Sequence, residues 1–150
     1  MGAFLEDINA FDHAFFNITP IEAERMDPQE RLFLQTVYHA IQDAGLSLES
    51  LSGKEVGCYV GVMNHGYSWF SLLDKTQGNP SSLFWSIANR ASYVFNWNGP
   101  SFAVDSACSS SLTALHTAIL GLKNSDCEIA VVGGVSLIVH PRQYEDLCQL

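Results

Sequence analysis

The 150-residue sequence predicts an α/β fold in which helices cover a parallel sheet. Two short apolar runs, residues 55–62 (EVGCYVGV) and 128–137 (EIAVVGGVSL), are rich in β-branched and small residues, which is typical of buried strands. Residues 101–105 (SFAVD) predict a further short strand, and a helical pattern separates them from the run at 128–137. A strand, a helix and a strand in this order predict a βαβ unit with parallel strands.

The composition limits the class of protein. A chain that is 47% hydrophobic and 15% charged has enough apolar side chains for the core of one globular domain. No apolar stretch reaches the roughly 18 residues of a membrane span, so we expect no membrane protein. The net charge of −9 disfavours a nucleic-acid partner. The first ten residues lack the basic start and apolar middle of a secretory signal, so we expect a cytoplasmic location.

Capping signals place two helices in the first third of the chain. Thr19, followed by a proline, predicts a short helix over residues 20–25. Asp27 is followed by a proline and then by Glu30 at the third helical position, which is the pattern of a capping box. The second helix therefore begins after Asp27, and Gly45 ends it.

The remaining elements follow from periodicity. Residues 63–82 predict a long irregular loop, and residues 83–95 predict a short helix. A further helix begins after Ser109 and ends near Asn124. Its expected apolar face carries Leu112, Leu115, Ile119 and Leu122, while Ala114 and Ala118 allow close packing.

Cys108 lies where the strand at 101–105 meets this helix. At such a junction the backbone N–H groups of Ser109, Ser110 and Ser111 would point toward the sulfur, and the positive end of the helix dipole favours the thiolate. The same N–H groups would hold the oxyanion that forms when a thioester is attacked. The alternative is that Cys108 is a small residue filling a tight turn, and the spacing by itself does not choose between the two.

The other cysteines indicate no metal site. Cys58, Cys127 and Cys148 form no CxxC pair and are spaced too widely for a zinc knuckle, so we expect free thiols and no bound metal. Their apolar surroundings are typical of small core residues.

The segment around Cys108 resembles a known motif. Residues 105–112 (DSACSSSL) are similar to the active-site motif of β-ketoacyl synthases, Asp-Thr-Ala-Cys-Ser-Ser-Ser-Leu, and differ only at Ser106. Other blocks resemble the same family in the same order, and the whole most resembles modular polyketide synthases. These blocks are residues 11–20 (FDHAFFNITP), 26–32 (MDPQERL), 88–93 (ANRASY) with 98–101 (NGPS), and 132–135 (VGGV).

The resemblance implies a thiolase-like fold, a mixed sheet covered by helices. Residues 1–150 would be the N-terminal half of a ketosynthase domain, without its opening strand and without its downstream histidine motifs. Cys108 would accept an acyl chain from the phosphopantetheine arm of an acyl carrier protein, for decarboxylative Claisen condensation with a malonyl-type extender in polyketide or fatty-acid synthesis. No bound cofactor is implied. The strand at 101–105 would pair across the two-fold axis of a homodimer.

The resemblance also implies which residues border the acyl channel, namely Met63, Asn64 and Tyr67. The five histidines offer no convincing base for Cys108; His116, two helical turns along, lies about 11 Å away in rise. We therefore expect the segment alone to be inactive in condensation. The alternatives are a cysteine acyltransferase or hydrolase, which needs a base within the chain, and a non-catalytic truncated piece that contributes only an interface.

Overall fold

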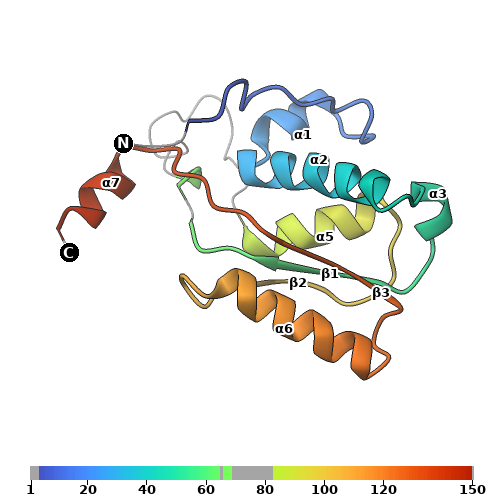
Figure 1. Ribbon diagram of the computed structural model, residues 1–150. Helices are drawn as coiled ribbons and strands as arrows, with labels where there is room; N and C mark the ends of the chain where they lie inside the picture. Colours follow the sequence, from blue (N-terminus) through green and yellow to red (C-terminus); the bar gives the residue numbers. More distant parts are fainter. Residues whose placement is uncertain (1–3, 65, 69–82, 150) are drawn as a thin grey trace.

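The computed structural model describes residues 4–64, 66–68 and 83–149. Most of the predicted loop at 63–82 therefore lies outside the described residues. The elements follow one another as helices around a small sheet (Figure 1): α1 (Pro20–Arg25), α2 (Pro28–Asp43), α3 (Leu48–Leu51), β1 (Val56–Gly61), α5 (Phe84–Val94), β2 (Ser101–Val104), α6 (Ser110–Lys123), β3 (Ile129–Gly134) and α7 (Arg142–Leu147).

The three described strands form a sheet in the order β2-β1-β3, and both pairings are parallel. Cys58 of the central strand lies opposite Ser101 on one side and Val131 on the other. Helix α6 covers one face of the sheet, and α5 and α2 lie on the other (Figure 1). This arrangement confirms the predicted α/β architecture and its βαβ unit. Of the mixed sheet that the resemblance implied, the described strands contain parallel pairs only.

Strand β1 is buried along its whole length because both of its faces are covered. Cys58 and Val60 belong to the main apolar core, which they share with α2 and α5. Tyr59 points to the opposite face and packs with Ala114 and Ala118 of α6 in a second, smaller cluster. The alternation follows from the two-residue period of a strand.

The predicted helix starts are present. Thr19 caps α1, with its Oγ1 accepting from the N–H of Glu22 at 3.3 Å. Asp27 caps α2, with its Oδ1 accepting from the N–H of Gln29 at 2.9 Å. Gly45 follows the end of α2 with φ +72°, the left-handed backbone that glycine adopts most easily.

Glu30, which the capping box assigned to the start of α2, has a different role. Its carboxylate, 1% exposed, accepts from the hydroxyl of Ser86 at 2.8 Å and from Nε of Arg90 at 3.0 Å. Arg90 also pairs with Glu22 of α1 at 2.7 Å. Burial raises the pKa of Glu30, whereas the hydrogen bonds from Arg90 and Ser86 lower it. Glu30 thus joins α2 to α5 inside the protein.

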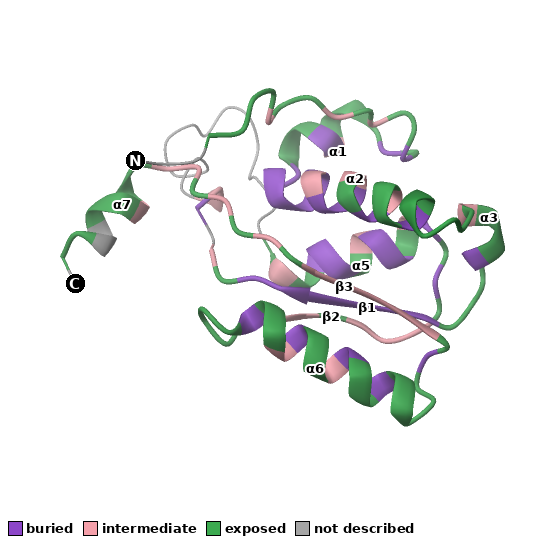
Figure 2. Ribbon diagram, in the orientation of Figure 1, coloured by how far each residue is buried: buried purple, intermediate pink, exposed green. Residues whose placement is uncertain are grey.

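Helix α6 turns its small residues to the sheet, and the leucine-rich face that was expected to be its buried side is exposed. The buried residues are Ser110, Ala114, Ala118 and Gly121. Figure 2 shows these purple positions on the side of α6 that faces the strands. The exposed side carries Leu112 (72% exposed), Leu115, Ile119, Leu120 and Leu122. Within the part of the chain that the structure describes, no helix combines the length and apolarity that a membrane crossing requires.

Replacing Arg90 with methionine should lower the free energy of unfolding by about 3 kcal/mol, because it leaves the buried Glu30 carboxylate without its charged partner. Urea unfolding of the protein measures the change. Glu30→Gln should lower the free energy of unfolding by less, because Arg90 keeps its ion pair with Glu22.

The loss in free energy of unfolding caused by Arg90→Met should be largest at neutral pH and smaller near about pH 4. Without Arg90 the pKa of Glu30 in the folded protein rises further above its ordinary value. A carboxyl with a raised folded-state pKa makes the protein less stable as the pH increases from the ordinary pKa of the group through its folded-state pKa. A pH-independent loss below about 1 kcal/mol would contradict the ion-pair role of Arg90.

Candidate active site around Cys108

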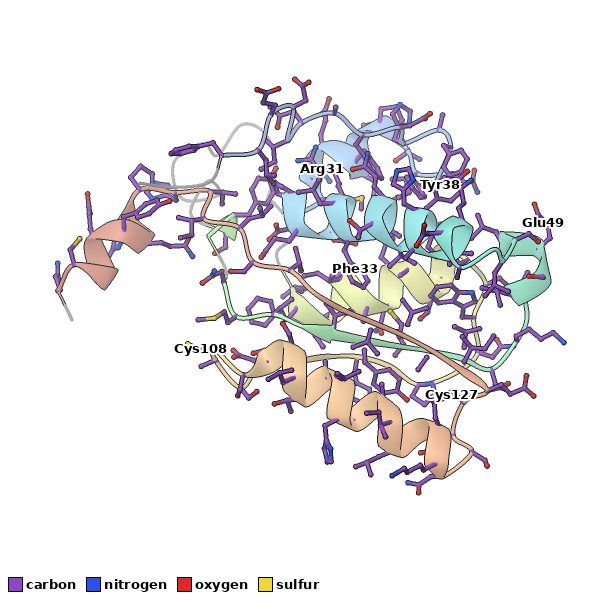
Figure 3. All side chains as sticks on the ribbon, viewed as in Figure 1. Arg31, Phe33, Tyr38, Glu49, Cys108 and Cys127 are labelled. Carbon is purple, nitrogen blue, oxygen red and sulfur yellow. The ribbon has the colours of Figure 1, made fainter. Side chains whose placement is uncertain are left out.

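Cys108 lies in the turn between β2 and α6, at the end of the sheet where the strands finish (Figure 3). It is exposed, and it borders an open cleft of about 240 Å³. The cleft is formed by the residues that end β1 and β3 together with the turn itself: Gly61, Val62, Met63, Gly134, Val135, Ser136, Ala107, Cys108, Ser110 and Ser111. The carboxyl ends of parallel strands are where α/β proteins commonly bind ligands.

Polar contacts hold the backbone of the turn immediately before the cysteine. Ala107 has φ 54°, a left-handed conformation that costs a non-glycine residue about 1 kcal/mol. Asp105 supports it, because its Oδ1 accepts from the N–H of Ala107 at 3.0 Å. The hydroxyl of Ser110, a buried residue, donates to the carbonyl of Ala107 at 2.6 Å and accepts from the N–H of Ser106 at 3.0 Å. The side chains of Asp105 and Ser110, one before and one after Cys108, therefore hold the backbone of the turn in place.

Ser106, the departure from the family motif, retains the hydroxyl that threonine would supply. Its Oγ lies 2.8 Å from Oγ1 of Thr113, one turn into α6. Ser109 donates its hydroxyl to the carbonyl of Ser106 at 2.8 Å. Ser106 thus uses its hydroxyl and its carbonyl to hold the turn to the start of α6.

The amides at the start of α6 differ from the expectation. The N–H of Ser109 bonds to the carbonyl of Ser106 at 3.3 Å, and the N–H of Ser110 bonds to the carbonyl of Ala107 at 3.0 Å. Neither is free for an oxyanion, because both close the tight turn. Among the described residues no acceptor takes the N–H of Ser111, so one of the three expected donors remains.

Two glycines let α6 begin directly against the strand ends. A Cβ atom at Gly61 would lie 2.6 Å from the backbone of Ser110 and Ser111, and one at Gly134 would collide with the hydroxyl of Ser111. A side chain at Gly61 would push the start of α6, and Cys108 with it, away from the sheet, whereas one at Gly134 would displace the hydroxyl of Ser111. The sequence interpretation did not single out Gly61. The signal was present, because glycines 57 and 61 stand four residues apart, on the same face of a buried strand.

The other cysteines differ from Cys108 in burial or position. Cys58 and Cys127 are buried, and burial raises the pKa of Cys58 to about 12, so it stays a thiol at neutral pH. Cys127 lies 3.7 Å from the hydroxyl of Tyr59 at the opposite end of the sheet (Figure 3). Cys148 is exposed, near α7.

The three residues expected along the acyl channel lie in different places. Met63 borders the cleft of Cys108. Asn64 donates its side-chain amide to the hydroxyl of Ser136 at 2.6 Å. Tyr67 donates its hydroxyl to the carbonyl of Glu24 at 3.1 Å, on the side of α1. A substrate-lining role for Met63, Asn64 and Tyr67 stays a prediction.

The cleft exposes the thiol of Cys108 and, among the described residues, no acid–base side chain beside it. Of the described residues that line it, none is histidine, aspartate or glutamate. Across residues 4–64, 66–68 and 83–149, no three His, Cys, Asp or Glu side chains gather as a metal site would need. The arrangement therefore provides a positioned, accessible thiol and leaves proton transfer to other groups.

The parallel sheet of the three described strands, covered by helices, makes the chain an α/β protein, and comparison with solved structures places it in the thiolase-like class. An oxazolomycin ketosynthase domain of Streptomyces albus JA3453 superposes with a TM-score of 0.93 at 46% identity, covering 99% of this chain and 27% of that one. The ketosynthase from module 6 of the bacillaene synthase of Bacillus subtilis 168 gives 0.87 at 43% identity, covering 97% and 25%.

The sequence model described as Beta-ketoacyl synthase, N-terminal domain, matches residues 1–150, and the chain belongs to this family. Curated relatives include Polyketide synthase ThaG of Burkholderia thailandensis, 51% identical over 146 residues, and Polyketide synthase PksM of Bacillus subtilis, 49% identical over 148 residues. The matches cover 95% and 97% of this chain but 3% of each relative. The chain thus spans a small part of the curated relatives and about a quarter of the solved ketosynthases.

Replacing Gly61 with alanine should slow the reaction of Cys108 with iodoacetamide and cost about 2 kcal/mol of stability, because backbone atoms of α6 must move. Peptide mass spectrometry of the full-length polypeptide follows Cys108, with the exposed Cys148 as internal reference. Gly45→Ala is the matched control: it strains a positive φ at a cost of about 1 kcal/mol in open space and should leave the Cys108 rate unchanged. Equal Cys108 rates in both variants would contradict the role of Gly61.

Proposed function

We propose that this chain supplies the nucleophile of a ketosynthase in polyketide assembly. Cys108 accepts an acyl chain from the phosphopantetheine arm of an acyl carrier protein, and the acyl group is then extended by decarboxylative condensation with a malonyl-type thioester. The observation that carries the proposal is the exposed Cys108, which borders an open cleft at the carboxyl ends of the strands. Hydrogen bonds made by the side chains of Asp105 and Ser110 hold the turn in which it lies. Membership of the β-ketoacyl synthase family supports it.

The first half of the reaction takes place at this turn. The thiolate of Cys108 attacks the thioester carbonyl, a new sulfur–carbon bond forms, and the bond to the phosphopantetheine sulfur breaks. The released phosphopantetheine thiolate takes up the proton that Cys108 gave to solvent. The free N–H of Ser111 is one donor within the described cleft for the transient oxyanion.

The second half needs groups that the described cleft lacks. Loss of carbon dioxide from the malonyl thioester generates a carbanion, whose attack on the acyl group returns the electron pair to the sulfur of Cys108. No acid–base side chain lines the described cleft to assist this step, so we assign it to a part of the domain outside this chain. The same feature counts against a self-sufficient cysteine hydrolase.

We accordingly interpret residues 1–150 as the N-terminal part of a ketosynthase domain, lacking the opening strand and the histidine motifs. The match to about a quarter of two solved ketosynthase chains supports this, as does the exposed leucine face of α6. A cytoplasmic location belongs to the same proposal.

A homodimer that pairs through β2 is part of the proposal. Among the described strands β2 has one neighbour, β1, and its other edge is open. The carbonyls of Pro100 and Val104 accept from N–H groups of β1 and the residue after it, so the N–H of Ala103 alternates to the open edge. An unpaired row of backbone groups is suited to pairing with a second copy.

Incubation with an acyl thioester tests the nucleophile. An extended polypeptide that includes the rest of the domain should gain one acyl mass by intact mass spectrometry, and Cys108→Ala should abolish the gain. The isolated 150-residue chain should acylate weakly, because of the three amides expected at the start of α6 only that of Ser111 is left without an acceptor among the described residues.

Three other outcomes would change the assignment. An adduct followed by rapid release of free acid would favour a cysteine hydrolase. No adduct in either form would leave a non-catalytic interaction piece. An adduct that persists in Cys108→Ala would place the nucleophile elsewhere.

Ala103→Pro should weaken the dimer at least about tenfold, because it removes an outward N–H from β2 and leaves the contacts to β1 in place. Light scattering on the full-length polypeptide over a dilution series measures the dissociation. Acylation of Cys108 at high protein concentration serves as the control for folding. An unchanged dimer in a folded variant would show that β2 is not the interface.

A further inference from the structure

We propose that Gln29 is a positioning residue that holds the two walls of the Cys108 cleft together, and this rests on the acyl-accepting role proposed above. Gln29 lies in the first turn of α2, is 1% exposed and does not border the cleft. Its effect on Cys108 chemistry is therefore exerted through the loops that it binds.

The side-chain amide of Gln29 bonds to the loops that follow two different strands. Its Nε2 donates to the carbonyl of Asn64 at 2.9 Å, three residues after β1 ends. Its Oε1 accepts from the N–H of Leu137 at 3.1 Å, three residues after β3 ends. One buried amide thus satisfies a backbone acceptor of the first loop and a backbone donor of the second, contacts that only a group with both functions can make.

These two loops are the walls of the cleft. Met63 borders it immediately before Asn64, and Ser136 borders it immediately before Leu137. The walls are also bonded to each other, because the side chain of Asn64 donates to the hydroxyl of Ser136 at 2.6 Å. The distance between the two walls is consequently set by the buried side chain of Gln29 and by the exposed hydrogen bond between Asn64 and Ser136.

The amide of Gln29 is itself held in one orientation. Asp27 accepts from the backbone N–H of Gln29 at 2.9 Å, and its second oxygen lies 3.5 Å from Nε2. A carboxylate at position 29 would keep the size of the side chain and the bond to Leu137. It would lose the bond to Asn64 and would face two acceptor oxygens instead, so the wall after β1 would move away.

The consequence is specific to bulky reagents. An acyl thioester must enter between the walls, and a displacement of about 1 Å at a reacting group can cost up to about a hundredfold in rate. Iodoacetamide needs only the exposed sulfur, which the turn at residues 105–110 holds independently of Gln29. A positioning role therefore separates the two reagents, whereas a general loss of structure slows both.

The test compares Gln29→Glu with wild type in the full-length polypeptide, using N-acetylcysteamine thioesters of increasing acyl length and iodoacetamide. Gln29→Glu should lower kcat/KM for acylation of Cys108 about tenfold, with the larger loss for longer chains, and keep the iodoacetamide rate within about twofold. Gln35→Glu is the matched control, because it makes the same change on the same helix at a partly exposed residue whose amide reaches only Ala10, at 3.5 Å. It should change neither rate.

Gln29→Glu that acylates like wild type, or that slows both reagents equally, overturns the proposal. If Gln29→Glu does not fold, Gln29→Met decides, since it keeps the length of the side chain and removes its bonds to Asn64 and Leu137. Slower acylation with intact alkylation then supports the proposal, and wild-type acylation overturns it. Wild-type protein without a Cys108 adduct contradicts the proposed function itself, whereas a wild-type adduct with no effect of either variant contradicts this inference alone.

Discussion

The close approach of α6 to the carboxyl ends of β1 and β3 is the constraint on which the rest of the site depends. Gly61 and Gly134 leave room for the backbone and hydroxyl of Ser111, so the helix begins in contact with the sheet. The chain leaving β2 must then reverse within a few residues, which places Ala107 at a positive φ. Cys108 follows at the outer point of this turn. Its exposure is a result of helix packing and does not depend on a flexible loop.

The first turn of α2 concentrates the buried polar contacts of the fold. Asp27, Gln29 and Glu30 are each at most 3% exposed, and every one has hydrogen-bond partners. Such groups are tolerated in a core only when they are satisfied, and here they join parts of the chain far apart in sequence. Gln29 binds the strand-end loops, whereas Glu30 binds α5. Two residues next to each other in α2 thus connect this helix to the loops that border the Cys108 cleft and to helix α5.

Much of the fold could be predicted because it depends on local signals. The caps at Thr19 and Asp27, the buried strand at 55–62 and the βαβ unit follow from short patterns, and each is present. The orientation of α6 could not be predicted from its leucines, because Ala114, Ala118 and Gly121 also recur at helical spacing. Which face of a helix packs against a sheet depends on how closely the residues of the strands allow the helix to approach. The contacts of Gln29 span 35 and 108 residues, and no local pattern contains them.

Helix α6 has two faces of unequal character, a sheet-facing stripe of small residues and an outer stripe of leucines. In any longer polypeptide the ribosome completes α6 before the segments that follow it. At about 5–20 residues per second, each further hundred residues takes about 5–20 s to make. During that interval the outer stripe exposes apolar side chains to water, the kind of surface through which incompletely folded chains associate. Production of the 150-residue segment by itself makes the interval permanent, so its yield in soluble form should depend on chaperone supply and on concentration.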